Sequence, residues 1–186
     1  MPTIRALQAD DDRSQFNSGD VDLDRFFTKY AGQNQFKHHI GTTYVALNDV
    51  DTVVGYATVA AGSIECDELP SSVTKKQKLP AYPLPVLRLA RLAVSADLKG
   101  QRIGESLLKY VLGLSVSMAN GFGCFGVVVD AYTTAVGYYR QYGFAAIGEV
   151  LEGESGSRPQ PTLMFLSMKD IKAASVAAAT ARKNAP

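Results

Sequence analysis

The chain has 186 residues, of which 46% are hydrophobic and 20% charged, and its 19 basic and 18 acidic residues give a net charge of +1. This length fits one ordinary domain with a sizeable core, and the composition is that of a soluble globular protein rather than a disordered one. The charge balance argues against a protein that coats nucleic acid with its whole surface, because such proteins carry a large positive excess.

The amino-terminal residues 1–12 contain no apolar segment of the kind found in signal peptides, and no apolar run approaches the length of a membrane span. A cytoplasmic protein with no contact to a membrane is therefore expected. Cys66 and Cys124 lie in no metal-ligand spacing, so we expect neither structural zinc nor a disulfide framework, and both cysteines should be small buried hydrophobes. His38 and His39 are expected to be solvated loop residues.

The first half of the chain alternates between short apolar runs and turn residues. Residues 3–7 predict a weak strand. Apolar residues at spacings of three and four predict an amphipathic helix over residues 21–35. Two runs rich in β-branched and aromatic residues, at 42–47 and 53–61, are separated by turn residues and predict a hairpin.

The second half begins with residues 65–85, which hold four prolines and show no strong pattern. Long loops of this kind are often functional, and a short helix at 71–77 is expected within this one. The pattern then predicts a strand at 86–94, a helix at 103–120, a strand at 125–129, a short helix at 133–142, and strands at 144–150 and 162–168. The Ala-rich tail, residues 171–186, is expected to be helical or frayed. This mixed order predicts an α/β or α+β sheet with helices on both faces.

The stretch from Arg91 to Leu108 is where a strand ends and a glycine-containing turn leads directly into a helix. The first amides of a helix lack intrahelical partners, and the helix dipole adds partial positive charge there. Gly100 and Gly104 allow close approach to the backbone, while the side chains at 99 and 102 add charge. The pattern predicts an anion site suited to a pyrophosphate, although a plain turn with solvated cations explains the same residues. It matches neither the Rossmann nor the Walker pattern.

Residues 99–104, Lys-Gly-Gln-Arg-Ile-Gly, resemble the acetyl-CoA loop of the Gcn5-related N-acetyltransferase (GNAT) superfamily, whose pattern is Gln/Arg-x-x-Gly-x-Gly/Ala. Two positions depart from the pattern: Lys99 replaces Gln or Arg, and Arg102 replaces the first glycine. Arg102 still supplies a backbone amide, and its side chain could meet a phosphate. The departures leave open a weakened cofactor site.

A second stretch, Ala135–Phe144, follows a strand end at 127–131 and resembles the superfamily's Ala-x-x-Phe-Tyr-x-x-x-Gly-Phe signature, with Tyr138 in the Phe place and Tyr139 in the Tyr place. Two signatures in the expected order are more specific than one, and the resemblance covers residues 3–168. It implies a GNAT fold of the α/β (α+β) class, with a mixed, mostly antiparallel sheet of about six to seven strands, flanking helices and a splayed strand pair that holds acetyl-CoA. We expect one GNAT domain, residues 1–170, followed by the tail.

Six segments carry a narrower resemblance: Leu23–Phe27, Tyr30–Gln35, Thr43–Val45, Val54–Tyr56, Pro83–Val86 and Arg91–Val94. They are similar to the acetyltransferase toxins of bacterial toxin–antitoxin pairs, which acetylate the α-amine of aminoacyl-tRNA. This resemblance implies a toxin that blocks translation, a tRNA substrate, a ribbon-helix-helix antitoxin as partner and a homodimer. Two alternatives stay open: a GNAT enzyme that acetylates a small-molecule or protein amine, and a non-catalytic acyl-CoA-binding regulatory module.

The resemblance also implies roles for single side chains. Tyr139 would be the general acid that protonates the departing CoA thiolate, because a tyrosine hydroxyl is protonated at neutral pH. The competing explanation is a ring packed on the sheet, which by its spacing fits Tyr138 better. Tyr142 and Phe144 are expected in the core.

The other implied roles belong mainly to the backbone. Leu92, Ala93 and Val94 would pair with the pantetheine arm, and an amide at Val94 or a neighbour would stabilise the oxyanion. The pyrophosphate would be held by Lys99, Gly100, Gln101, Arg102, Ile103, Gly104 and Glu105. No metal is implied. No side chain is an obvious general base: Asp130 is a candidate, a surface or capping aspartate is the more frequent explanation, and a water relay or an amine that is neutral without help is an equal alternative.

Positive charge is concentrated in one part of the sequence. Residues 71–110 carry eight basic and two acidic residues, a net charge of +6, so the rest of the chain has a net charge of −5. This part includes the loop expected to bind the cofactor, and its excess leaves room for a second substrate that bears phosphates. The chain-wide balance therefore excludes a uniformly basic binder, not a locally basic one.

Overall fold

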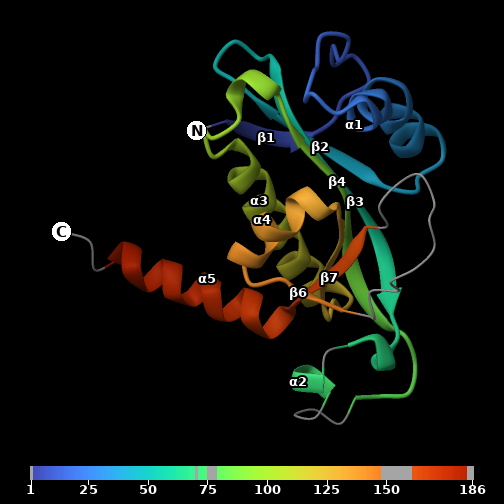
Figure 1. Ribbon diagram of the computed structural model, residues 1–186, viewed down its shortest axis with the longest axis vertical. Coiled ribbons are helices and arrows are strands. Elements are labelled where there is room, and N and C mark those ends of the chain that lie inside the picture. Colours follow the sequence, from blue (N-terminus) through green and yellow to red (C-terminus); the bar gives the residue numbers. More distant parts are fainter. Residues whose placement is uncertain (1, 70, 75–78, 148–160, 184–186) are drawn as a thin grey trace. The chain divides into compact units, whose positions relative to one another are not determined.

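The protein is described by a computed structural model that covers residues 2–69, 71–74, 79–147 and 161–183 (Figure 1). Its strands are β1 Thr3–Ala6, β2 Thr42–Leu47, β3 Val53–Ile64, β4 Leu84–Val94, β5 Gly126–Ala131, β6 Ala145–Ala146 and β7 Thr162–Ser167. They form a seven-stranded sheet in the order β1-β2-β3-β4-β5-β7-β6. The pairs β1–β2, β2–β3, β5–β7 and β6–β7 are antiparallel. The mixed α/β class with a mostly antiparallel sheet is therefore confirmed.

Helical segments of three kinds connect and flank the strands. The α-helices are α1 Val21–Arg25, α2 Ser71–Thr74, α3 Ile103–Gly121, α4 Val136–Gln141 and α5 Met168–Lys183. The 3-10 helices in the described ranges are η3 Cys66–Glu68, η4 Ala96–Leu98 and η5 Thr133–Ala135. Two π-helices, η1 Phe26–Tyr30 and η2 Gln33–Lys37, follow α1.

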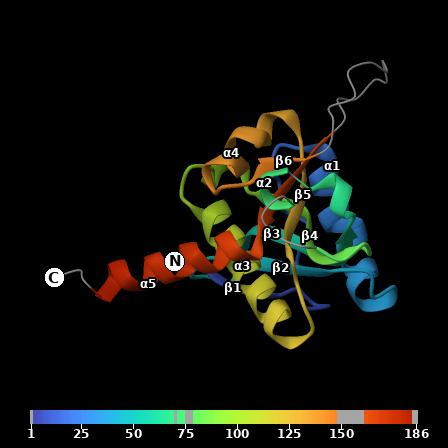
Figure 2. The same ribbon diagram turned by 90° about the horizontal axis from the view of Figure 1, so that it is seen from below.

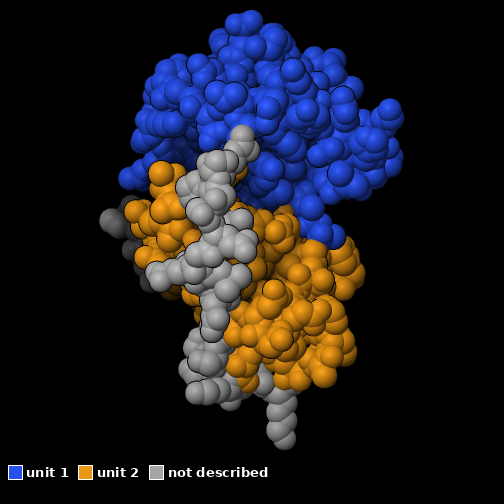
Figure 3. Space-filling view, turned by 45° about the vertical axis from the view of Figure 1, so that its right-hand side comes forward, with its two compact units in different colours: residues 1–61, 89–114 blue, residues 62–88, 115–186 orange. Residues whose placement is uncertain are grey.

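The chain divides into two compact units, coloured separately in Figure 3. Unit 1 consists of residues 1–61 and 89–114, and unit 2 consists of residues 62–88 and 115–186. The long elements β3, β4 and α3 contribute residues to both units.

The core of unit 1 forms where aromatic residues from two other segments pack on Tyr56 of β3. Phe27 stacks on Tyr56 with ring centroids 4.4 Å apart and planes 6° apart, and Phe16 meets both rings edge-on. Tyr56 stands opposite Val45 in the β2–β3 register, so both side chains point to the same face. The buried members of this cluster are Leu7, Phe16, Phe27, Ala31, Val45, Leu47, Val53, Tyr56 and Ala93.

The helical segment 21–37 differs from the α-helix expected over 21–35, because two of its turns are π turns. Asp20 caps its start by accepting hydrogen bonds from the amides of Asp22 and Leu23. The side chains that face the strands, Phe27, Ala31 and Gln35, are spaced by four, and a pure α-helix would rotate such a series away from the strands. π turns contain more residues than α turns and so keep this series on one face.

The core of unit 2 is formed by side chains of β5 and β7 together with the end of β3, the start of β4 and the segment between β3 and β4. β5 pairs with β7 from Gly126 opposite Ser167 to Ala131 opposite Thr162. A Cβ on Gly126 would lie 2.4 Å from the carbonyl oxygen of Leu166, so only glycine fits at this approach. The buried members of this cluster are Ile64, Leu69, Leu84, Val86, Val128, Ile147 and Phe165.

The expected elements are present with shifted boundaries. α2 coincides with the start of the helix expected at 71–77, and residues 75–77 lie outside the described part. β6 is the start of the strand expected at 144–150, of which residues 148–150 also lie outside it. The tail expected from 171 belongs to a helix that already begins at Met168, and Figures 1 and 2 show this helix, α5, running away from the strands of unit 2. No helix in the described ranges is long and apolar enough to cross a membrane.

Candidate functional site

The strand-to-helix turn predicted as an anion site lies in unit 1. β4 ends at Val94, the amide of Ser95 donates to the carbonyl of Val54 (3.0 Å), and η4 leads into an exposed turn at residues 99–102. α3 then begins at Ile103. The turn and the first turn of a long helix are therefore consecutive in the structure, as expected for a phosphate-binding loop.

Two residues of this turn have left-handed backbone conformations. Gly100 has φ of 86° and Arg102 has φ of 60°. The Arg102 conformation explains why the family pattern has glycine at this position, since a residue with a Cβ pays about 1–2 kcal/mol to adopt it. A non-glycine residue held in this region is a form of strain that clusters at binding sites.

The turn presents free backbone donors and cationic side chains to solvent. The amide of Ser106 donates to the carbonyl of Arg102 (3.0 Å), which closes the first helical turn and leaves the amides at 103–105 without intrahelical acceptors. Arg102 is exposed, as is Lys99, whose Nζ lies 3.9 Å from the place a Cβ would take on Gly19. The ammonium of Lys99 is therefore turned toward the preceding loop.

Glu105 is the one acidic residue in the predicted loop, and its charge is balanced locally. Its carboxylate accepts a 2.5 Å contact from the Lys109 ammonium one helical turn later. The hydrogen bond from Lys109 lowers the pKa of Glu105, so the carboxylate stays ionised and paired. The pair removes most of the repulsion that a lone carboxylate would exert on a bound phosphate.

The three predicted strand residues lie at the end of β4. Ala93 is buried in the core of unit 1, and Leu92 and Val94 are half-buried. Gly55 on β3 holds this strand end close, since a Cβ there would lie 3.0 Å from the Ala93 carbonyl oxygen. The backbone of this strand end therefore packs closely on β3.

Tyr139 lies in unit 2 on α4 and is buried, with 6% of its surface exposed. Burial raises the pKa of its hydroxyl, so it remains protonated throughout the neutral range. Its ring contacts the rings of Tyr138 and Phe144, with centroids 5.2 and 5.5 Å apart. Tyr138 is only half-buried, and its ring also packs on Tyr142. Its spacing made Tyr138 the better candidate for a ring packed on the sheet, but Tyr139 is the more buried of the two tyrosines.

Asp130 has a partner that the sequence did not reveal. Its carboxylate forms an ion pair with Arg88 on β4, 42 residues away in the chain and within the same unit. The guanidinium occupies one of the carboxylate oxygens. This contact favours a positioning role for Asp130 over proton abstraction. No sequence pattern could have found it, whereas the four-residue spacing of Glu105 and Lys109 is recognisable in a helix.

The structure brings the predicted residues together in two groups. The strand end and the loop, residues 92–94 and 99–105, adjoin one another in unit 1, while Tyr139 and Asp130 belong to unit 2. Cys124 is buried, as expected, and Cys66 is half-buried with its thiol donating to the carbonyl of Pro80. Within the described ranges, no group of three acidic, histidine or cysteine side chains is arranged to hold a metal ion.

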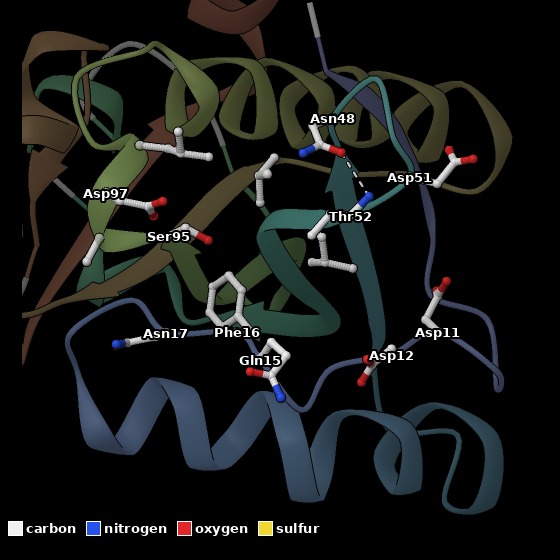
Figure 4. Close-up of a pocket in the computed structure, with 14 residues that line it drawn as sticks. Asp11, Asp12, Gln15, Phe16, Asn17, Asn48, Asp51, Thr52, Ser95 and Asp97 are labelled. Atoms are coloured by element: carbon white, nitrogen blue, oxygen red, sulfur yellow. Dashed lines mark hydrogen bonds between the residues drawn. The ribbon is translucent and has the colours of Figure 1, made fainter.

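Unit 1 also has a pocket of about 680 Å³ that contains none of the predicted site residues (Figure 4). Its walls come from the segment before α1, from the β2–β3 turn, where Asn48 accepts a hydrogen bond from the amide of Thr52, and from the residues just after β4. Four carboxylates line it, those of Asp11, Asp12, Asp51 and Asp97, and no lysine or arginine does.

The charge of this pocket makes it unsuited to a phosphate-bearing cofactor. The hydrogen bond from Arg5 lowers the pKa of Asp11, and the amide of Ser14 lowers that of Asp12, so both are ionised at neutral pH. Ionised carboxylates that line a pocket repel a phosphate group placed inside it. The exposed turn at 99–102, rather than this pocket, has the electrostatics of an anion site.

Known proteins are similar to this chain over almost its whole length. A tRNA-acetylating toxin of Mycobacterium tuberculosis (strain ATCC 25618 / H37Rv) is 29% identical over 170 residues, which are 91% of this chain and 93% of the relative. Among solved structures, AtaT complexed with acetyl-methionyl-tRNAfMet is 26% identical with a TM-score of 0.77, covering 92% of this chain and 98% of that one.

Two further structures support the same relationship. AtaTR bound with AcCoA is 28% identical with a TM-score of 0.72, covering 92% of this chain and 96% of that one. A mutant of KacT is 24% identical with a TM-score of 0.80, covering 92% and 97%, and shows the likeness of fold. The family described as acetyltransferase (GNAT) domain matches residues 12–161. Because that match spans most of the chain and the fold agrees with it, the chain belongs to the GNAT acetyltransferase family.

Proposed function

We propose that this protein is an acetyl-CoA-dependent N-acetyltransferase that acetylates the α-amine of aminoacyl-tRNA and thereby blocks translation as a toxin. The observation that carries this proposal is the relative named tRNA-acetylating toxin, which matches nearly the full length of both chains. The structure named as AtaT with acetyl-methionyl-tRNAfMet supports the same substrate class. Family membership alone is compatible with many acceptor amines.

The proposed cofactor site uses the turn and the strand end of unit 1. The free amides at 103–105, the left-handed turn at 100–102 and the exposed side chains of Lys99 and Arg102 suit the pyrophosphate of acetyl-CoA. No atom lies within 4 Å of the place a Cβ would take on Gly100, so the backbone there is open to a ligand. The backbone of Leu92–Val94 is proposed to pair with the pantetheine arm and to donate an amide to the oxyanion.

Tyr139 is proposed as the hydrogen-bond donor to the sulfur that leaves as a thiolate. The amine attacks the thioester carbonyl, a tetrahedral intermediate forms, and its collapse breaks the carbon–sulfur bond while the departing sulfur takes up a proton. Because burial keeps the Tyr139 hydroxyl protonated, it is available as a donor over the whole neutral range. A neutral donor held in an apolar environment stabilises developing negative charge more strongly than bulk water does.

The amine needs little help in losing its own proton. The α-amine of an aminoacyl ester is less basic than a lysine side chain, so a substantial fraction is neutral near pH 7 to 8, in the range of other α-amines. Asp130 is held by Arg88 and is proposed to be structural or positioning. Proton loss to water is therefore the proposed route.

The partners of a toxin follow from this proposal. An aminoacyl-tRNA acceptor places the protein in the cytoplasm, and a structure named as AtaT bound to the C-terminus of the antitoxin AtaR supports an antitoxin partner. We propose a ribbon-helix-helix antitoxin and a homodimer, together with a GNAT domain at 1–170 and an Ala-rich tail at 171–186. Mass measurement of the purified protein tests the dimer, and co-purification with the product of the adjacent reading frame tests the antitoxin.

Transfer of radiolabelled acetyl from acetyl-CoA tests the function directly. Charged tRNA is compared with uncharged tRNA, a polyamine and a lysine-containing peptide. Label on charged tRNA alone, released by mild base together with the aminoacyl ester, is the expected result. Label on the free amines only would replace the toxin by an ordinary GNAT enzyme, and binding of acetyl-CoA without transfer to any acceptor would identify a non-catalytic module.

A further inference from the structure

The outer face of the helical segment 21–37 carries an unusual combination of side chains. Lys29, Tyr30, Phe36 and Lys37 surround Gln33 at spacings of three and four, which makes them neighbours on a helix. Tyr30 is 46% exposed and Phe36 is 44% exposed, and both lysines are exposed. We call these five residues the aromatic–basic patch.

Among the described residues, the patch has no ion-pair partner and no ring partner. Neither Lys29 nor Lys37 forms an ion pair with any other described residue, in contrast to Arg25, which pairs with Asp22 at 2.7 Å. The rings of Tyr30 and Phe36 stack on no other ring in the described ranges. Residues 25–41 contain no aspartate or glutamate. Two large rings and two cations are thus presented to solvent without local neutralisation.

The opposite face of the same segment is firmly anchored. The Phe27 ring stacks on Tyr56, whose hydroxyl donates to the carbonyl of Leu23 (2.8 Å). The Gln35 side chain donates to the carbonyl of Leu7 (2.9 Å) and accepts from the amide of Thr43 (2.8 Å). The patch is therefore held rigidly on the surface of unit 1, so that a ligand binding it would lose less free energy to ordering the protein.

Two π turns coincide with this surface. η1 carries Lys29 and Tyr30, and η2 carries Gln33, Phe36 and Lys37. π turns are rare and occur frequently at functional sites. Here they keep the inner series Phe27, Ala31 and Gln35 in register, and the outer series Lys29, Gln33 and Lys37, which has the same spacing of four, stays aligned as well.

We propose, on the basis of the function proposed above, that the aromatic–basic patch binds the single-stranded 3′ end of the acceptor RNA. The lysines supply contacts to phosphates, and the two rings supply faces on which unpaired bases stack. Bases inside a duplex are stacked on one another and cannot use such faces, so a single-stranded end fits better than a helical stem. The acidic pocket of unit 1 has the opposite charge and provides no such surface.

Binding of a labelled RNA hairpin with a single-stranded CCA end, compared with the same hairpin cut back to a blunt end, tests the proposal. For the Tyr30→Ala/Phe36→Ala variant, the Kd for the hairpin with the CCA end should rise about tenfold or more, and the preference over the blunt hairpin should disappear. Tyr30→Phe keeps a stacking face and should bind as the wild type does. For Lys29→Ala/Lys37→Ala, the plot of the logarithm of the association constant against the logarithm of the salt concentration should become shallower. The magnitude of its negative slope should decrease by about 1.4, or about 0.7 for each lost phosphate contact.

Lys169→Ala/Lys172→Ala is the matched control, because these lysines are exposed on α5 in the other unit. It should retain the affinity and salt slope of the wild type, and all variants should melt as the wild type does. Equal losses in the control and in the patch variants would overturn the proposal, since the effect would then be one of net charge. Wild-type RNA affinity in both patch variants would overturn it too, as would retained RNA binding together with lost binding of the antitoxin.

Turnover separates this proposal from the function on which it rests. The ratio of kcat/KM for aminoacyl-tRNA to that for a free amino-acid ester should fall about tenfold in the aromatic variant, mainly through KM for the RNA substrate. If the wild type acetylates aminoacyl-tRNA and the variants show the same ratio, the patch is not the RNA site. If the wild type does not acetylate aminoacyl-tRNA at all, the proposed function fails and the patch loses its basis.

Discussion

Arg102 and Tyr139 show how single residues are fitted to the proposed chemistry. Arg102 has a left-handed backbone with φ of 60° in a turn where the family has glycine. The strained backbone at this position is therefore accompanied by an extra cation beside the predicted pyrophosphate. Tyr139 is buried as a neutral phenol, because burial strongly destabilises its ionised form.

Arg102→Gly and Arg102→Ala separate strain from charge. Both variants lose the guanidinium, and only glycine relieves the left-handed strain. That relief, about 1–2 kcal/mol, exceeds the extra folding entropy of glycine, about 0.5–1 kcal/mol, so the Gly variant should be more stable than the Ala variant by about 0.5–1 kcal/mol. Urea denaturation measures the difference. Equal stability of the two would show that Arg102 is not left-handed in solution.

Tyr139→Phe removes the proposed proton donor and leaves the ring. Turnover should fall by about 10²–10⁴-fold, the usual contribution of general acid–base catalysis, while the Kd for CoA stays within about twofold of the wild type. Tyr142→Phe is the control, since its ring also contacts the Tyr138 ring, with centroids 5.1 Å apart. Wild-type turnover in the Tyr139 variant would remove the residue from the mechanism.

The buried Tyr139 hydroxyl also gives a pH dependence of stability. In the unfolded chain the hydroxyl ionises near pH 10, and in the folded protein burial raises its pKa above that value. The unfolded state therefore releases this proton first, and the free energy of unfolding should fall as the pH rises above 10. Urea denaturation at pH 8, 10 and 11 should show a steeper loss for the wild type than for Tyr139→Phe. Parallel losses would mean that Tyr139 is solvated.

At the scale of elements, the predicted cofactor turn depends on how tightly α3 and the end of β4 pack on β3. Gly55 is the point of closest approach: a Cβ there would lie 3.0 Å from the Ala93 carbonyl oxygen, 3.1 Å from Leu107 Cδ1 and 3.2 Å from Ile103 Cγ2. Backbone on one side and the first turns of α3 on the other leave no room for a methyl group. The placement of the helix start is therefore coupled to a single glycine in the neighbouring strand.

Gly55→Ala should force these elements apart and reduce stability by about 1–3 kcal/mol, the usual cost of overpacking a core. It should also weaken acetyl-CoA binding, because the helix start moves. Gly113→Ala is the matched control in α3, where nothing lies within 4 Å of the added methyl group. That variant should be as stable as the wild type or more stable by up to about 1 kcal/mol. Thermal unfolding and CoA titration of both variants measure the effects, and similar outcomes for the two glycines would contradict the close approach.

At the scale of the whole molecule, the residues proposed for catalysis are divided between the two units. Residues 99–105 of unit 1 are proposed to hold the pyrophosphate, and Tyr139 of unit 2 is proposed to serve the leaving sulfur. A ligand that binds only the folded protein stabilises it by mass action, by about 2.7 kcal/mol at a concentration one hundred times its Kd. Binding of acetyl-CoA should therefore slow amide hydrogen exchange around both groups of residues.

Hydrogen exchange with and without acetyl-CoA tests this distribution. The amides at 103–105 lack intrahelical acceptors and should exchange rapidly in the free protein and much more slowly in the complex. Exchange over α4, residues 136–141, should slow as well, while exposed residues 172–178 of α5 serve as the unaffected control. Slowing around the acidic pocket, residues 11–17 and 95–98, in place of 99–105 would mean that the cofactor binds in that pocket.

Periodicity and glycine placement in the sequence determined most of the secondary structure and the turn at 99–104, because a strand end, a glycine turn and a helix start are local features set by neighbouring residues. The family resemblance likewise determined the class of fold. Tertiary structure alone decided the π turns at 26–37, the length of the last strands and helix, and which of Tyr138 and Tyr139 is the more buried. It also decided the pairing of Asp130 with Arg88 and the exposure of Tyr30 and Phe36. The physical reason is common to these cases: each depends on contacts between segments distant in the chain, and a helical period that must match a neighbouring strand cannot be read from the helix itself.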